Sequence, residues 1–198
     1  NKKITNFNGI AEFIQGPLIP LLRDNVATFK ILLERDLEIW IAHHLLNVID
    51  PKFYIHDNKP VSGMSNGTVK KSKVRFTMPD QMIRDTIGWI GIINELKADK
   101  ARDNGTYLHR KNSTKEFKKD FTKMNKYFEN PKLKKHLRHG FFIYICRDAD
   151  LTEAEIKNEI SKHIHHKQII PIVINRYWDA KNDCWYSQEK MEQINAEF

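Results

Sequence analysis

Two acidic residues and a lysine near the middle of the chain have the types and spacing of groups that act together in catalysis. Glu95 and Lys97 stand two positions apart at the polar end of the apolar stretch 89–98, and fourteen positions separate Asp80 from Glu95. Alternate residues of a strand share a face, so Glu95 and Lys97 are expected to project to the same side. A hairpin turn near Thr86–Gly88 would bring Asp80 alongside Glu95.

Two neighbouring carboxylates beside an ammonium group form a site for a hard divalent cation. Mg²⁺ takes oxygen ligands in an octahedron and keeps several waters, so two carboxylates, a backbone carbonyl and a substrate phosphate suffice. The residues around 80 and 95–97 are therefore predicted to hold Mg²⁺, with Mn²⁺ as its substitute, and to position a water molecule.

The rest of the sequence predicts the elements that hold this site. Apolar residues recur at helical spacing over 26–49, and Asp50-Pro51 ends that helix. The stretch 89–98 is apolar on both faces, as in a central strand covered by helices. The full order predicts an α/β fold with a mixed sheet. Its further strands are expected over 53–55, 73–84, 140–146 and 169–174, and its further helices over 113–128 and 152–166.

Length and composition favour a single domain. The 198 residues, 40% of them hydrophobic, can bury one substantial core, so we assign 26–198 to one domain and 1–25 to an N-terminal arm or extension. There is no apolar span of membrane-crossing length and no secretion signal, and two cysteines are too few for a disulfide framework. These features predict a cytoplasmic protein with no membrane association.

The net charge of +8 is concentrated in one segment. Fourteen Lys and Arg lie between Lys97 and His139 against five acidic residues, so the remainder of the chain is near neutral. Such a segment is typical of binding to nucleic acid, because each neutralised phosphate releases counterions. A solvated helix face is the alternative. The DNA contacts predicted in this segment are Lys100, Arg110, Lys111, Lys115, Lys118, Lys119 and Lys126.

The motifs and their placement resemble the PD-(D/E)XK nuclease superfamily. The resemblance consists of Pro79-Asp80, fourteen intervening positions and Glu95-Leu96-Lys97, preceded by a long helix with the string Glu34-Arg35-Asp36-Leu37-Glu38. It covers about residues 26–175 in the order that the superfamily uses. Each motif is short, so their joint placement carries the resemblance. It implies a restriction-endonuclease-like fold, with a mixed β-sheet core flanked by helices.

The resemblance also implies roles for the central residues. Asp80 and Glu95 would hold the divalent ion, with the Leu96 backbone carbonyl as a further ligand. Lys97 would orient or activate the attacking water and stabilise charge on the phosphorus oxygens. The catalytic set expected from the resemblance is therefore Asp80, Glu95 and Lys97.

Helices on either side of the central strand often complete such sites. An acidic residue of the first helix is a further metal ligand in many relatives, and Glu34 and Glu38 are the candidates. The local string Glu-Arg-X-Leu favours Glu34, while a solvated helix edge is the alternative for both residues. Asn125 and Tyr127 stand where related enzymes often carry a polar residue and a tyrosine, and a core tyrosine is the alternative there.

The function implied is a divalent-metal-dependent endonuclease that hydrolyses DNA phosphodiester bonds, in restriction, other defence or repair. Two alternatives stay open at this stage: a nucleic-acid- or protein-binding module with a vestigial site, and an RNA-directed nuclease. The chain has no RNA-recognition motif of the Lys/Arg-Gly-Phe type, which favours DNA. Specificity, exonuclease or endonuclease action, and assembly into a homodimer or larger complex are not determined by these motifs.

Overall fold

A five-stranded mixed sheet is the framework of the fold. In the computed structural model, which describes residues 3–28, 30–57, 79–99, 113–148 and 150–196, β3 lies at the centre of the sheet. The first three strands pair antiparallel, whereas β3, β4 and β5 run parallel. The strand order is β1 (Tyr54–Asp57), β2 (Gln81–Arg84), β3 (Ile90–Ala98), β4 (His139–Cys146) and β5 (Ile169–Asn175).

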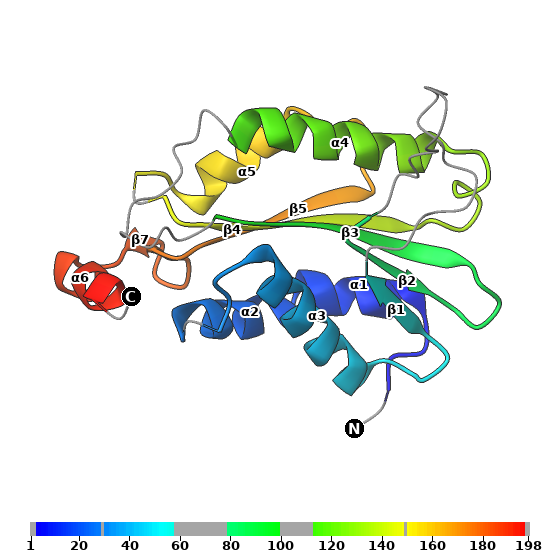
Figure 1. Cartoon of the computed structure of the whole chain (residues 1–198), viewed down its shortest axis with the longest axis horizontal. Coiled ribbons are helices and arrows are strands. Elements are labelled where there is room, and N and C mark those ends of the chain that lie inside the picture. The colour runs from blue at the N-terminus through cyan, green and yellow to red at the C-terminus, as the bar shows by residue number, and fades with distance from the viewer. Residues whose placement is uncertain (1–2, 29, 58–78, 100–112, 149, 197–198) are drawn as a thin grey trace, which may run out of the picture.

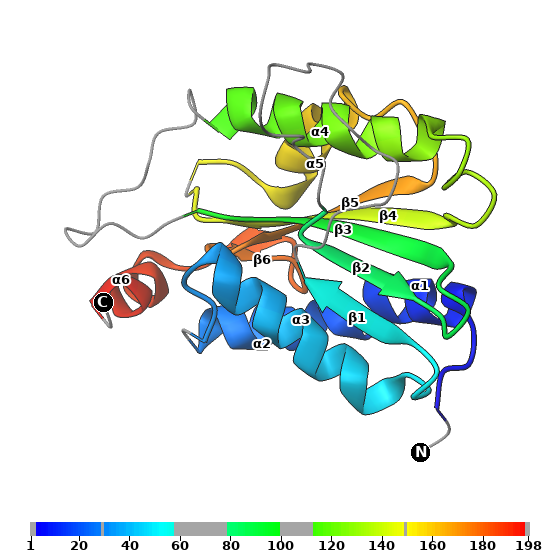
Figure 2. The same cartoon turned by 45° about the vertical axis from the view of Figure 1, so that its right-hand side comes forward.

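Helices cover both faces of this sheet (Figures 1 and 2). One face carries α1 (Phe7–Gln15), α2 (Leu18–Ala27) and α3 (Glu34–Val48), and the other carries α4 (Ser113–Glu129) and α5 (Glu153–Ser161). The parallel strands need crossover connections, and α4 and α5 lie in the two crossovers. The predicted mixed α/β sheet flanked by helices is therefore confirmed.

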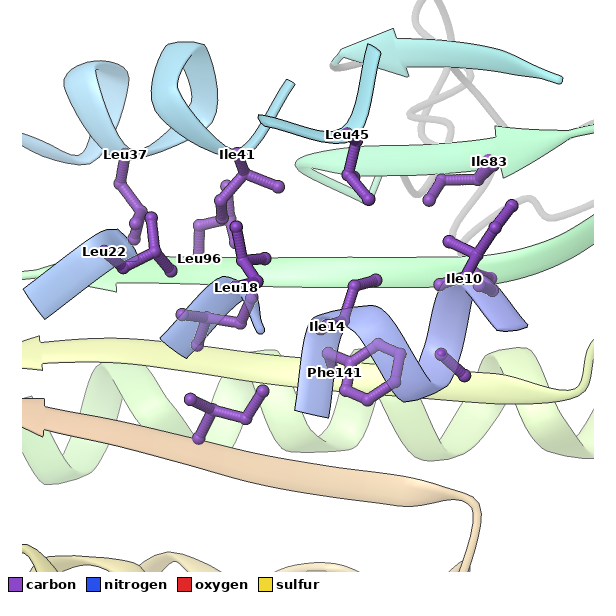
Figure 3. Packing of buried hydrophobic residues seen from close by; sticks show 14 of the residues in the cluster. Ile10, Ile14, Leu18, Leu22, Leu37, Ile41, Leu45, Ile83, Leu96 and Phe141 are labelled. Atoms are coloured by element: carbon purple, nitrogen blue, oxygen red, sulfur yellow. The ribbon is translucent and has the colours of Figure 1, made fainter. Parts of the chain in front are cut away.

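The central strand contributes side chains to both hydrophobic layers, as its two apolar faces predict. Leu96 belongs to the same hydrophobic cluster as Leu37 and Ile41 of α3 and Phe141 of β4, in the layer between the sheet and α1–α3 (Figure 3). Ile93 belongs to the layer beneath α4 and α5. β3 is thus fixed from both sides, which gives any polar residue at its end a rigid support.

The N-terminal residues are part of the core and do not form an arm. Ile10 and Ile14 of α1 and Leu18 of α2 are fully buried against the sheet, and the boundary expected at residue 26 falls inside α2. Two prolines of this region lie at the start of a helix. Pro17 is the N-cap of α2 and Pro20 lies in its first turn, where the missing N–H costs little.

The long helix predicted over 26–49 corresponds mainly to α3, which is separated from the end of α2 by a break. α2 ends at Ala27, and α3 begins only at Glu34. The start of α3 is fixed by Asp36, whose Oδ2 accepts hydrogen bonds from the backbone N–H groups of Leu32 (3.0 Å) and Leu33 (2.9 Å). The break places Glu34 in the first turn of α3, next to the end of the central strand.

The other predicted boundaries mostly agree with the structure. The strands expected over 53–55, 140–146 and 169–174 correspond to β1, β4 and β5, and the helix expected over 113–128 is α4. The helix expected over 152–166 is shorter, since α5 ends at Ser161. Of the strand expected over 73–84, residues 73–78 lie outside the described part of the chain.

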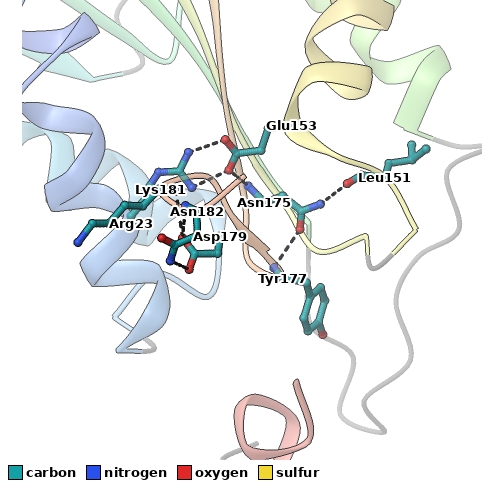
Figure 4. A network of polar contacts seen from close by, with 8 residues as sticks. All are labelled: Arg23, Leu151, Glu153, Asn175, Tyr177, Asp179, Lys181 and Asn182. Carbon is teal, nitrogen blue, oxygen red and sulfur yellow. Dashed lines mark hydrogen bonds and ion pairs between the residues drawn. The ribbon is translucent and has the colours of Figure 1, made fainter. Parts of the chain in front are cut away.

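A polar network ties the end of β5 to α2 and α5 (Figure 4). Arg23 donates two hydrogen bonds to the Glu153 carboxylate, of 2.6 and 2.5 Å, and Glu153 Oε1 accepts from the Asn175 N–H at 2.8 Å. Asn175 Nδ2 donates to the Leu151 carbonyl at 2.6 Å.

Beyond this network lie β6 (Trp178–Asp179), β7 (Cys184–Trp185) and α6 (Gln188–Ala196). Within the described residues, no helix has the length and apolar character needed to cross a membrane.

Candidate active site

The β2–β3 hairpin brings Asp80 to Glu95. Gln81 lies opposite Asn94, so the next pair along the two strands is Asp80 and Glu95. The turn contains Gly88 with a φ of +92°, a left-handed conformation that favours glycine. Asp80 is held against the central strand, because its Oδ2 accepts a 2.7 Å hydrogen bond from the Leu96 N–H. The structure therefore brings together the two carboxylates predicted to bind metal.

Glu95 is a fully buried carboxylate, with 0% of the residue exposed. Burial and the neighbouring charge of Asp80 raise the pKa of Glu95 above its ordinary value, and the Lys123 ammonium only partly opposes them. Lys123 Nζ lies 2.5 Å from Glu95 Oε2. Oε1 has no hydrogen-bond partner among the described residues. The described part of the chain thus satisfies this carboxylate incompletely.

Lys97 lies between carboxylates from both helical layers. Its Nζ is 3.1 Å from Glu34 Oε2 on α3 and 3.5 Å from Asp120 Oδ2 on α4. Burial alone would lower the pKa of Lys97, but the carboxylates of Asp120, Glu34 and Asp80 outweigh burial and raise it above its usual range. Lys97 is therefore a permanent cation at neutral pH.

The structure distinguishes between the two glutamates considered on the first helix. Glu34 reaches the site through its contact with Lys97. Glu38 is buried and pairs with Arg35 at 3.1 Å, and its backbone carbonyl accepts a hydrogen bond from Gln81 Nε2. The contact of Glu34 with Lys97 joins its carboxylate to a predicted catalytic residue.

Helix α4 contributes residues that the sequence analysis did not assign to the site. Asp120 contacts Lys97, and Lys123 contacts Glu95. Burial raises the pKa of the Asp120 carboxyl, and the ammonium groups of Lys97 and Lys123 partly offset that effect. The signal that could have found these residues is their spacing: positions 120, 123 and 127 share one helix face, beside the apolar stripe of Phe117, Phe121, Met124 and Phe128.

Tyr127 completes the α4 side of the site. Its side chain is buried, and its hydroxyl has no hydrogen-bond partner among the described residues. Burial, together with the charges of Glu95, Asp80 and Asp120, raises the pKa of this phenol. Asn125, which was considered alongside it, has a structural role instead. Its amide hydrogen-bonds the His163 carbonyl and the His165 N–H, both at 3.2 Å, which ties α4 to the end of α5.

The predicted DNA contacts are only partly within the described residues. Lys118, Lys119 and Lys126 are exposed on α4. Lys115 lies in the first turns of α4, but its side chain is outside what the structure describes. Lys100, Arg110 and Lys111 also lie outside the described residues. The described part of α4 therefore carries exposed lysines of the basic segment on the helix that borders the site.

The fit of a divalent cation can be judged from the oxygen atoms of the site. Within the described ranges, no group of three or more His, Cys, Asp or Glu side chains is arranged to hold a metal ion. Two carboxylates and a carbonyl are nevertheless a sufficient protein contribution for Mg²⁺, which keeps several waters. Oε1 of Glu95, which is buried and has no partner among the described residues, and the adjacent Asp80 are oxygen donors that fit such an ion.

Comparison of the chain with protein-family models, with curated proteins and with solved structures found no match. The chemistry of the site therefore has to be inferred from its own residues.

Proposed function

We propose that the chain is a divalent-metal-dependent endonuclease that hydrolyses DNA phosphodiester bonds on a restriction-endonuclease-like core. The observation that carries the proposal is the meeting of Asp80, Glu95 and Lys97 at one end of the central strand, with Glu95 fully buried and one of its oxygens unpartnered among the described residues. Buried carboxylates are normally satisfied by hydrogen bonds, cations or metals. The mixed sheet with helices on both faces supports the same class of fold.

The metal would be held by Asp80, Glu95 and the Leu96 carbonyl. Bound Mg²⁺ or Mn²⁺ polarises a phosphoryl oxygen and lowers the pKa of a coordinated water. Asp80 is already oriented by the Leu96 N–H, and Glu95 lies on the central strand of the sheet, which is packed on both faces. Such support keeps the ligands close to the geometry needed for binding.

Lys97 acts in this proposal as a fixed positive charge. Because its pKa is raised, it does not accept a proton at neutral pH, so it is not the general base. It donates hydrogen bonds to the attacking water or to the phosphate oxygens and stabilises the negative charge of the transition state. Glu34 and Asp120 hold the ammonium group in place, which makes Glu34 a positioning residue.

DNA would approach along α4. Lys119 and Lys126 lie one turn before and one turn after Lys123, which contacts Glu95, and both are exposed. Cations along one helix can follow a phosphate backbone without reading its sequence. This arrangement places a non-specific electrostatic surface next to the carboxylates.

A second function, a nucleic-acid-binding module without catalysis, is favoured by one specific feature. Both Glu95 and Lys97 already have ion-pair partners within the chain, Lys123 for the first and Glu34 and Asp120 for the second. A site that satisfies its own charges can persist for structural reasons.

One assay separates these functions and the two classes of nucleic acid. The purified protein is incubated with supercoiled plasmid or with single-stranded RNA in Mg²⁺, in Mn²⁺ and in EDTA, and binding is followed in parallel by fluorescence anisotropy. We expect nicked or linear plasmid only when the metal is present. Linear product at early times would indicate paired sites, as in a homodimer. Binding without product under all three conditions would contradict the nuclease proposal and favour the binding module, and cleavage of RNA alone would overturn the assignment to DNA.

A further inference from the structure

The ion pair between Lys123 and Glu95 is distinctive because of where its two partners lie. Glu95 is on the central strand and has no exposed surface, whereas the Lys123 side chain is on α4 and keeps 22% of its surface exposed. The two groups are in direct contact, 2.5 Å apart. The ammonium group therefore reaches from the protein surface to the carboxylate on which the proposed metal depends.

We propose that Lys123 is a built-in counter-cation, which neutralises Glu95 beside the metal position when no divalent ion is bound and moves away when the ion binds. This inference rests on the proposed function, since it assumes a metal site at Asp80 and Glu95. It adds a regulatory property to that site: a metal-free resting state in which the chain neutralises its own carboxylate.

The first step of the argument is that the metal-free protein needs a cation at this position. Glu95 is buried next to Asp80, and Asp120 adds a further negative charge. A buried carboxylate without a compensating charge is strongly unfavourable. Lys97 is held between Glu34 and Asp120, so Lys123 is the ammonium group that the structure places on Glu95.

The second step is that the ammonium group and a divalent ion compete for the same carboxylate. A Mg²⁺ ion binds its oxygen ligands at about 2.1 Å, so an ion on Oε1 of Glu95 and an ammonium group in contact with Oε2 of the same carboxylate would be within a few ångströms of each other. Like charges at that separation repel strongly in a poorly solvated site. Lysine has a flexible four-carbon stem, and the partial exposure of Lys123 gives it a path to solvent.

The first test compares Lys123→Met with Lys126→Met, a matched control that removes an exposed positive charge from the same helix. Mn²⁺ affinity is measured without nucleic acid, from the free-ion signal in electron paramagnetic resonance. We expect Lys123→Met to bind Mn²⁺ roughly tenfold or more tightly than wild type, because the competing charge is gone, and Lys126→Met to bind within about twofold of wild type. Equal or weaker binding by Lys123→Met would overturn the inference.

The second test uses the wild-type protein, so it does not depend on a variant that folds. Amines are acetylated under limiting reagent, with and without Mn²⁺, and the modification of Lys123 relative to Lys126 is read by mass spectrometry. We expect the relative labelling of Lys123 to rise several-fold on metal binding, whereas unchanged or reduced labelling would overturn the displacement.

The outcomes separate this inference from the proposed function. Wild-type protein that binds Mn²⁺ with no effect at Lys123 would refute the inference and leave the nuclease proposal intact. No Mn²⁺ binding by either wild type or Lys123→Met would refute both.

Discussion

Lys97 and Lys123 both approach the carboxylates of the site, but they are held differently. Lys97 contacts carboxylates from α3 and from α4, so its ammonium group is fixed in two directions. Lys123 reaches Glu95 from the surface of a single helix. Lys97 projects from the central strand and Lys123 from a partly exposed position on α4, and we assign the transition-state charge to Lys97 and the resting-state charge to Lys123.

Removing the charge of Lys97 should slow the chemical step. Lys97→Met keeps the length of the side chain, and we expect the single-turnover rate of metal-dependent DNA cleavage to fall about 10²- to 10³-fold, as when one transition-state hydrogen-bond donor is lost. DNA affinity should change little, since one of many cations is removed. The exposed Lys132→Met serves as the control. A Lys97→Met protein that cleaves at the wild-type rate would remove Lys97 from the mechanism.

The raised pKa of Lys97 also determines how the rate depends on pH. Burial opposes the ammonium form, but the charges of Asp120, Glu34 and Asp80 outweigh it, so Lys97 stays protonated well above neutral pH. Its contribution is therefore present throughout the range from about pH 7 to 9 and is lost only at higher pH. We expect single-turnover rates of the wild-type protein not to decline between about pH 7 and 9. A decline in this range that disappears in Lys97→Met would contradict the prediction.

At the scale of the elements, the sequence predicts the parts of the fold whose periodicity is unambiguous. The central strand β3 begins with an apolar run, and β4 and β5 are apolar over most of their length, which indicates strands buried on both faces. The amphipathic stripe of α4 is equally clear. These elements suffice to place Asp80, Glu95 and Lys97 together, because a hairpin and a strand period of two fix their relative positions.

The features that the sequence analysis did not predict depend on long-range contacts. Residues 1–25 were expected as an arm or extension, but they include two short helices, whose burial depends on the sheet that they cover. Asp120 and Lys123 were counted only as part of a charged segment. Their role depends on which face of α4 lies against β3, and that is set by packing across the sheet. Local propensity carries little information about either feature.

The position of α1 in the core leads to a stability prediction. Ile14 is fully buried beneath the sheet, so we expect Ile14→Ala to lower the free energy of unfolding by about 2–4 kcal/mol, from lost burial and the cavity left behind. Ile39, which is 53% exposed on α3, provides a matched control, and Ile39→Ala should change stability by less than about 0.5 kcal/mol. Urea denaturation measures both. Equal effects of the two substitutions would contradict the packing of α1.

At the scale of the whole molecule, the described lysines of α4 and the carboxylate site lie on the same side of the sheet. The exposed lysines of α4 flank the helix face that contacts Glu95 and Lys97. A polyanion attracted to this helix would therefore be delivered to the proposed catalytic residues. The opposite layer, α1–α3, contributes Glu34 to the site, and its helices build one of the two hydrophobic cores.

This distribution predicts how DNA binding responds to salt. Replacement of Lys118, Lys119 and Lys126 by Gln should weaken binding to all sequences and reduce the slope of log K against log [salt] by about 2–3, because up to three phosphate contacts are lost. The control replaces three exposed lysines on and after α5, Lys157, Lys162 and Lys167, and should leave the slope almost unchanged. Fluorescence anisotropy titrations at several KCl concentrations measure both. An unchanged slope in the α4 variant would exclude this helix from the DNA interface.

The central claim is that Glu95 holds a catalytic metal ion, and cleavage of supercoiled plasmid by Glu95→Gln tests it most directly. This substitution keeps the shape of the side chain and removes its negative charge, and Glu12→Gln, an exposed residue of α1, is the control. With circular dichroism confirming a folded protein, we predict that Glu95→Gln still binds DNA, while its Mg²⁺-dependent cleavage falls by at least about 10²-fold. A folded Glu95→Gln protein that cleaves plasmid at the wild-type rate would contradict the account.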